Sequence, residues 1–113
     1  MDHKQILLIT AETLGQGPAE LGERLIGAFF HTLAESSTPP ATIILMNSGV
    51  KIAVDGARTV SDLQTLAAAG VEILACGTCL GYFDLRDRLA VGKVSNMYEI
   101  AGKLMEAPRV VSL

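Results

Sequence analysis

Short apolar runs alternate with amphipathic segments along this chain, and this alternation constrains the fold more than any other feature. The apolar runs lie at residues 6–10, 41–46, 71–75, 91–95 and 109–113. Segments with helical periodicity lie between them, at residues 18–34, 61–69, 80–89 and 97–107. Strands that alternate with helices are typical of a parallel sheet with helices on both faces. We therefore predict an α/β fold with a five-stranded sheet.

Two capping boxes predict where later helices begin. Ser61 precedes Gln64 by three residues, and Asn96 precedes Glu99 by the same spacing. Residues 50–54 fit either a helical turn or an extended piece, so the pattern leaves that segment open.

The length and charge of the chain limit its class of function. Its 113 residues suffice for one domain, over residues 1–113. A net charge of -3 without a basic cluster argues against nucleic acid as a partner. No apolar run approaches the roughly 20 residues that cross a membrane, and no secretory signal begins the chain. We expect a cytoplasmic protein.

The chain is unusually apolar for its size. Hydrophobic residues make up 50% of it, charged residues 19%, and the mean hydropathy is +0.40. The apolar residues of segment 18–34 cover roughly half of the helical circumference, which is more than one sheet contact requires. We expect a homo-oligomer that buries part of this surface between subunits.

Both cysteines lie in one short motif, Cys76-Gly-Thr-Cys79, directly after the third apolar run. A thiol at the end of a buried strand, in a loop that leads into a helix, can have its pKa lowered by backbone N–H groups. Its thiolate could accept a sulfane sulfur as a persulfide, which a second thiol releases by exchange. The alternative is that both cysteines only fill space below the loop.

Right-handed crossovers bring the carboxyl ends of parallel strands to one edge of the sheet, where open α/β sheets bind ligands. This edge collects polar and small residues from several loops. The candidate substrate-binding residues there are Gly15, Gly17, Asn47, Gly77, Thr78 and Asn96.

Other chemistries fit the sequence less well. Thioredoxin-like dithiol exchange expects its motif near the start of a βαβ unit, not after the third strand. Zinc needs two further ligands, and only His3 and His31 are available. The Gly15-x-Gly17 pair lacks the third glycine of a dinucleotide fingerprint. We therefore expect neither a metal nor a cofactor.

Several segments together resemble the DsrE/DsrF-like family, and in particular the C-terminal domain of YedF-type, sulfurtransferase-like proteins of selenium metabolism. The matching segments run in family order over nearly the whole chain. They are residues 14–17 with 20–22, 47–51, 70–80 (GVEILACGTCL) and 91–97 (VGKVSNM). The resemblance implies a three-layer α/β/α fold with a mainly parallel five-stranded sheet.

The resemblance also implies a role in sulfur or selenium relay. Cys76 would hold the persulfide and Cys79 would be the partner thiol. Protein donors and acceptors, among them a TusA-like protein, would be the partners of a trimer, a larger ring or a dimer. YedF-type proteins carry an N-terminal TusA-like domain that this chain lacks, so we expect the donor to be a separate protein. A non-catalytic oligomeric interaction subunit and a small-ligand binding module remain the alternatives.

Overall fold

Five parallel strands form one sheet in the structure, a computed structural model that describes residues 2–113 and the side chains of residues 5–113. The sheet order is β4-β3-β2-β1-β5. The strands are β1 (Asp2–Ile9), β2 (Pro40–Leu45), β3 (Glu72–Cys76), β4 (Lys93–Ser95) and β5 (Arg109–Ser112). This confirms the predicted five-stranded sheet, and every pairing in it is parallel.

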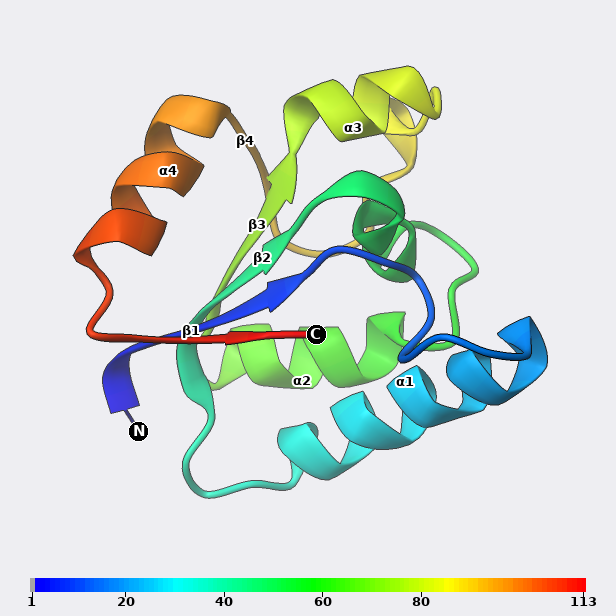
Figure 1. Ribbon diagram of the computed structural model, residues 1–113, viewed down its shortest axis with the longest axis horizontal. Coiled ribbons are helices and arrows are strands. Elements are labelled where there is room, and N and C mark those ends of the chain that lie inside the picture. The colour runs from blue at the N-terminus through cyan, green and yellow to red at the C-terminus, as the bar shows by residue number, and fades with distance from the viewer. Residues whose placement is uncertain (1) are drawn as a thin grey trace.

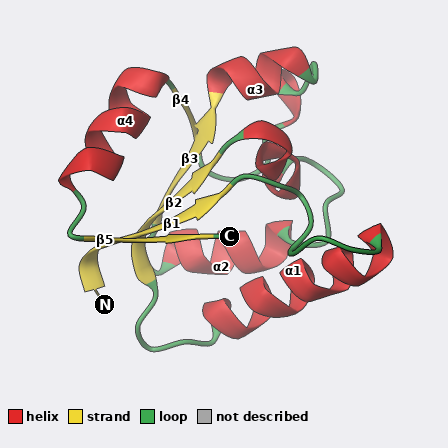
Figure 2. Ribbon diagram, in the orientation of Figure 1, coloured by secondary structure: helices red, strands yellow, loops and turns green. Residues whose placement is uncertain are grey.

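Helices cover the sheet on both faces, which gives the predicted three layers (Figure 1). Helices α1 (Ala19–Ala34) and α2 (Val60–Ala68) lie side by side below the sheet, and α4 (Met97–Glu106) lies on the other face. The short α3 (Gly77–Tyr82) extends beyond the carboxyl end of β3 (Figure 2). Two 3₁₀ helices complete the chain, η1 (Asn47–Ala53) and η2 (Arg86–Arg88).

The core lies between the central strands and the helices that cover them. Ile43 and Ile44 of β2, Leu74 of β3 and Phe30 of α1 are completely buried. Because both faces of the sheet are covered, successive residues of β2 and β3 are buried, and these strands appear in the sequence as continuous apolar runs. In the described part of the chain, no helix is long and apolar enough to cross a membrane.

The N-cap predicted at Ser61 is wrong, and the N-cap predicted at Asn96 is correct. Helix α2 begins at Val60, which puts Ser61 inside the helix, and the Thr59 hydroxyl before it donates to the carbonyl of Ile52 instead. At α4, the Asn96 side chain accepts a hydrogen bond of 3.0 Å from the backbone N–H of Glu99, as predicted.

The helix predicted over residues 80–89 is also wrong. The cysteine motif is itself the first turn of α3, so the helix starts at Gly77 and ends at Tyr82. Asp84 then adopts a left-handed conformation with φ of 57°, which breaks the helix before η2. The ambiguous segment 50–54 belongs mostly to η1.

Candidate functional site

Cys76 ends the third strand and begins the short helix that follows. It is the last residue of β3 and the N-cap of α3, and only 4% of its surface is exposed. On the neighbouring strand, Ser95 pairs with it in register. The strand-end position predicted from the sequence is confirmed, but the thiol belongs to the core.

Gly77 allows three elements to meet at this point. A Cβ atom built on it would lie 2.9 Å from Arg86 Nη2 and 3.0 Å from both Ser95 O and Val94 Cγ1. The flexible end of Arg86 could move away, but the Ser95 carbonyl and the Val94 side chain are closer than most Cβ contacts, so a larger residue here would force α3 and β4 apart slightly. The contacts of Gly77 therefore give it a packing role.

Cys79 is half-buried and lines a cavity of about 370 Å³. The other lining residues are Asn47, Thr78, Tyr82 and Phe83. The backbone N–H of Asn47, the first residue of η1, donates a hydrogen bond of 3.1 Å to Cys79 Sγ. Asn47 and Thr78, two of the predicted substrate-binding residues, line this cavity, and their binding role stays a prediction.

The pKa of the Cys79 thiol is raised above its ordinary value. Burial is the main cause, and hydrogen bonding and charge interaction with the neighbouring Cys76 thiol raise it further. The hydrogen bond from the Asn47 backbone acts in the opposite direction, because it favours the thiolate. The net shift of the Cys79 pKa is upward.

Sequence analysis missed the aromatic wall of this cavity. Tyr82 and Phe83 lie three and four residues after Cys79, a spacing that puts them on its side of the helix. Their rings pack edge to face with centroids 5.2 Å apart. Lys51, also missed, places its ammonium 4.3 Å from the centroid of the Phe83 ring. Lys51 could have been recognised from the sequence, because it is the one charged residue in the mostly apolar segment that forms η1.

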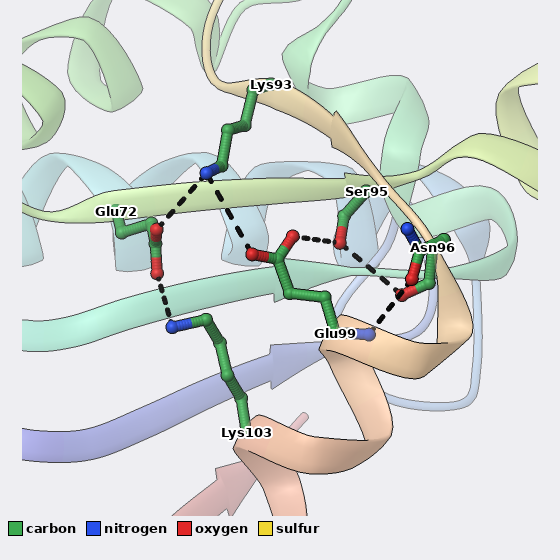
Figure 3. A network of polar contacts seen from close by, with 6 residues as sticks. All are labelled: Glu72, Lys93, Ser95, Asn96, Glu99 and Lys103. Carbon is green, nitrogen blue, oxygen red and sulfur yellow. Dashed lines mark hydrogen bonds and ion pairs between the residues drawn. The ribbon is translucent and has the colours of Figure 1, made fainter.

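A network of polar contacts links α4 to β3 and β4, the strands of Cys76 and Ser95 (Figure 3). The buried Ser95 hydroxyl donates 2.6 Å to the Glu99 carboxylate, and Lys103 Nζ lies 2.9 Å from Glu72. Lys93 lies between the two carboxylates, 3.6 Å from Glu72 and 3.9 Å from Glu99. The network therefore joins β3, β4 and α4 through charged and polar contacts.

The remaining predicted site residues lie elsewhere. Asn96 caps α4 and is not among the residues that line the Cys79 cavity. Gly15 and Gly17 occupy the loop after β1 with φ of 83° and 148°, and they do not line this cavity either. Both have the positive φ that favours glycine, which gives them a role in the turn.

A larger cavity of about 530 Å³ lies between η1, α1 and the loops after β1 and before α2. Its charged lining residues are Glu12, Glu23, Lys51 and Arg58.

Among the described residues, no three His, Cys, Asp or Glu side chains are grouped to hold a metal ion. His31 lies 3.3 Å from Asp62 on the helix surface, and the side chain of His3 lies outside the described residues.

Comparisons with known proteins agree with this architecture. The sequence model of the DsrE/DsrF-like family matches residues 13–113. The fold is similar to that of the ychN protein from E. coli, with 19% identity, a TM-score of 0.68 and 100% coverage of both chains. It is also similar to MTH1491 from Methanobacterium thermoautotrophicum, a protein of unknown function, with 18% identity and a TM-score of 0.71 over 99% of this chain and 100% of the other. No curated protein matches the sequence significantly.

Proposed function

Because this chain belongs to the DsrE/DsrF-like family, we propose that it carries sulfur or selenium as a persulfide or its selenium analogue on the Cys76–Cys79 pair and passes it to a protein partner. Membership of this family suggests a sulfur-relay function in general, together with protein partners. A similar fold does not by itself indicate a particular reaction, so the proposed reaction must be supported by the residues of the site.

The observation that carries the proposal is the sulfur of Cys79 in the wall of an open cavity, with the Cys76 thiol beside it. A persulfide transfer needs one thiol that a donor can reach and one that can take part in exchange. Cys76 is the thiol that holds the cargo in this proposal, and Cys79 is its exchange partner.

The cavity also favours a class of donor. None of its five lining residues is an Asp, Glu, Lys, Arg or His, and two of them are aromatic. Such a wall suits a donor that is a protein with a persulfidated cysteine, such as a TusA-like protein, better than it suits a free inorganic oxyanion.

The surface of α1 supports a homo-oligomer. Leu21 and Leu25 on its outer side remain 52% and 43% exposed.

Mass spectrometry tests the proposal. The reduced protein is incubated with a small-molecule persulfide donor and, separately, with a persulfidated TusA-like protein. We expect the wild type to gain the mass of one or more sulfur atoms, which a reductant removes. The Cys76→Ser, Cys79→Ser double variant is the matched control and should gain nothing. If the wild type gains no more sulfur than the double variant, the proposal is wrong.

A second candidate, a non-catalytic interaction subunit, is favoured by the burial of Cys76 and by the raised pKa of Cys79. Packing cysteines are inert in such surroundings. Titration of the native protein with a thiol reagent separates the two functions. Two thiols that react only after unfolding would support the packing role, whereas one fast and one slow thiol would support the relay.

A further inference from the structure

The two cysteines differ in what a donor can reach. Cys76 is 4% exposed and is not among the residues that line the cavity, whereas Cys79 forms part of the cavity wall. A sulfur atom that enters the cavity therefore meets Cys79 first. The resemblance to sulfur-relay proteins assigns the leading role to the strand-end cysteine, so this order follows from the geometry and not from the family.

A backbone donor is aimed at the sulfur that the cavity exposes. Asn47 follows β2 after one intervening residue, Met46, and has φ of 52°, in the left-handed region. Its backbone N–H lies 3.1 Å from Cys79 Sγ, and its own side-chain oxygen accepts a 2.8 Å hydrogen bond from the Ser48 N–H. Asparagine tolerates this conformation better than other non-glycine residues, so the residue type fits the turn.

We infer that Cys79 is the first acceptor of sulfur, that the left-handed turn at Asn47 orients it through the N–H to Sγ hydrogen bond, and that Cys76 receives the sulfur second. This inference rests on the proposed function. In this order Asn47 is a positioning residue, because it acts through the thiol of Cys79.

The chemistry of both steps balances. The Cys79 thiolate attacks the outer sulfur of a donor R–S–SH, the donor S–S bond breaks, and R–S⁻ leaves with the electron pair. Cys79 then carries S–SH. The Cys76 thiolate attacks that same outer sulfur, and Cys79 leaves as the thiolate. Each step exchanges one S–S bond for another, so neither needs an oxidant or a reductant.

Two backbone hydrogen bonds favour the thiolate of Cys79: one from the Asn47 turn, which is the larger effect, and one from the backbone of Cys79 itself. The Cys76 thiol and the Tyr82 hydroxyl share the site with Cys79. The Lys51 ammonium from η1 lies over the Phe83 ring. Burial and Cys76 both raise the pKa of Cys79, so loss of the Asn47 hydrogen bond would raise it further.

The decisive comparison is Asn47→Gly against Asn47→Ala, both in a Cys76→Ser background in which Cys79 is the one remaining thiol. Glycine adopts a positive φ freely and keeps the N–H in place, whereas alanine disfavours it. The rate of alkylation of Cys79 is measured against pH. A hydrogen bond to an ionised group is worth roughly one pKa unit or more. We expect alanine to move the midpoint up by about one unit and to slow the reaction at pH 7 about tenfold, with glycine unchanged.

Asp84→Ala is the control for strain, because Asp84 also has a left-handed φ, of 57°, but makes no hydrogen bond to the sulfur. It should lower the melting temperature to a similar extent without moving the pH midpoint. If Asn47→Ala and Asn47→Gly give the same midpoint as the parent, the turn does not orient the thiol and that part of the inference is wrong.

The order of transfer is tested by the two single variants under the persulfide donor. We expect Cys79→Ser, which keeps only the buried thiol, to gain sulfur at least tenfold more slowly than Cys76→Ser, which keeps the thiol in the cavity wall. Equal rates, or a faster Cys79→Ser, would overturn the order and leave the proposed function standing. Absence of sulfur on the wild type would instead refute the proposed function.

Discussion

Replacement of Gly49 by alanine should be strongly destabilising because of one backbone contact. A Cβ atom on Gly49 would lie 2.5 Å from the carbonyl oxygen of Ile9, at the end of β1. That oxygen already accepts a 2.9 Å hydrogen bond from the Met46 N–H, so it cannot turn away without losing this bond. Overpacking costs about 1–3 kcal/mol and a lost hydrogen bond about 1 kcal/mol. We expect Gly49→Ala to lower the free energy of unfolding by about 2–4 kcal/mol.

Gly102→Ala is the matched control, since it makes the same chemical change in open space. Gly102 is exposed in the middle of α4, and a Cβ atom there would meet nothing within 4 Å. Alanine is the better helix former by about 0.5–1 kcal/mol, so this variant should be more stable than the parent.

Urea unfolding followed by far-UV circular dichroism measures both changes. With a denaturant slope of about 2 kcal/mol per molar, the midpoint of Gly49→Ala should fall by about 1–2 M. Because η1 begins with Asn47, the folded Gly49→Ala protein should also show slower alkylation of Cys79. A midpoint of Gly49→Ala equal to that of the parent would refute the reasoning.

Two further variants probe the network around α4. Burial raises the pKa of Glu72, but the ammonium groups of Lys103 and Lys93 lower it more, so its folded pKa is below the ordinary value. Its ionised form therefore contributes stability above the unfolded pKa of about 4.3, and this is lost as the pH falls through the folded pKa. Glu72→Gln should flatten the acid limb of melting temperature against pH, and an unchanged limb would contradict the assignment. Asn96→Ala should cost about 1 kcal/mol in urea unfolding through loss of the bond to the Glu99 N–H, and Asn96→Ser should restore most of it.

Much of the fold could be predicted because the governing signals are local. Continuous apolar runs indicated the central strands β2 and β3, which helices cover on both faces. Asn96 indicated the start of α4 through a contact within four residues. The Ser61 box failed because Thr59 makes a tertiary bond to Ile52 that no short window contains.

The site was harder to predict because its contacts join distant residues. The hydrogen bond between Asn47 and Cys79 spans 32 positions, and it depends on a backbone conformation that the residue type permits but does not require. The motif predicted a loop between β3 and the next helix. Instead α3 begins at Gly77, which buries Cys76 and turns Cys79 toward the cavity.

The sheet order has a consequence for synthesis on the ribosome. Strand β1 pairs on one flank with β2, but on the other with β5, where Leu7 lies opposite Val111, more than a hundred residues later. While the nascent chain emerges, one flank of β1 keeps unpaired amide and carbonyl groups until β5 is made. Contacts of such high sequence separation form slowly and leave a strand open to wrong pairing. A strand that becomes central to the finished sheet is thus an exposed edge for most of translation, and it is there that a chaperone would be most useful.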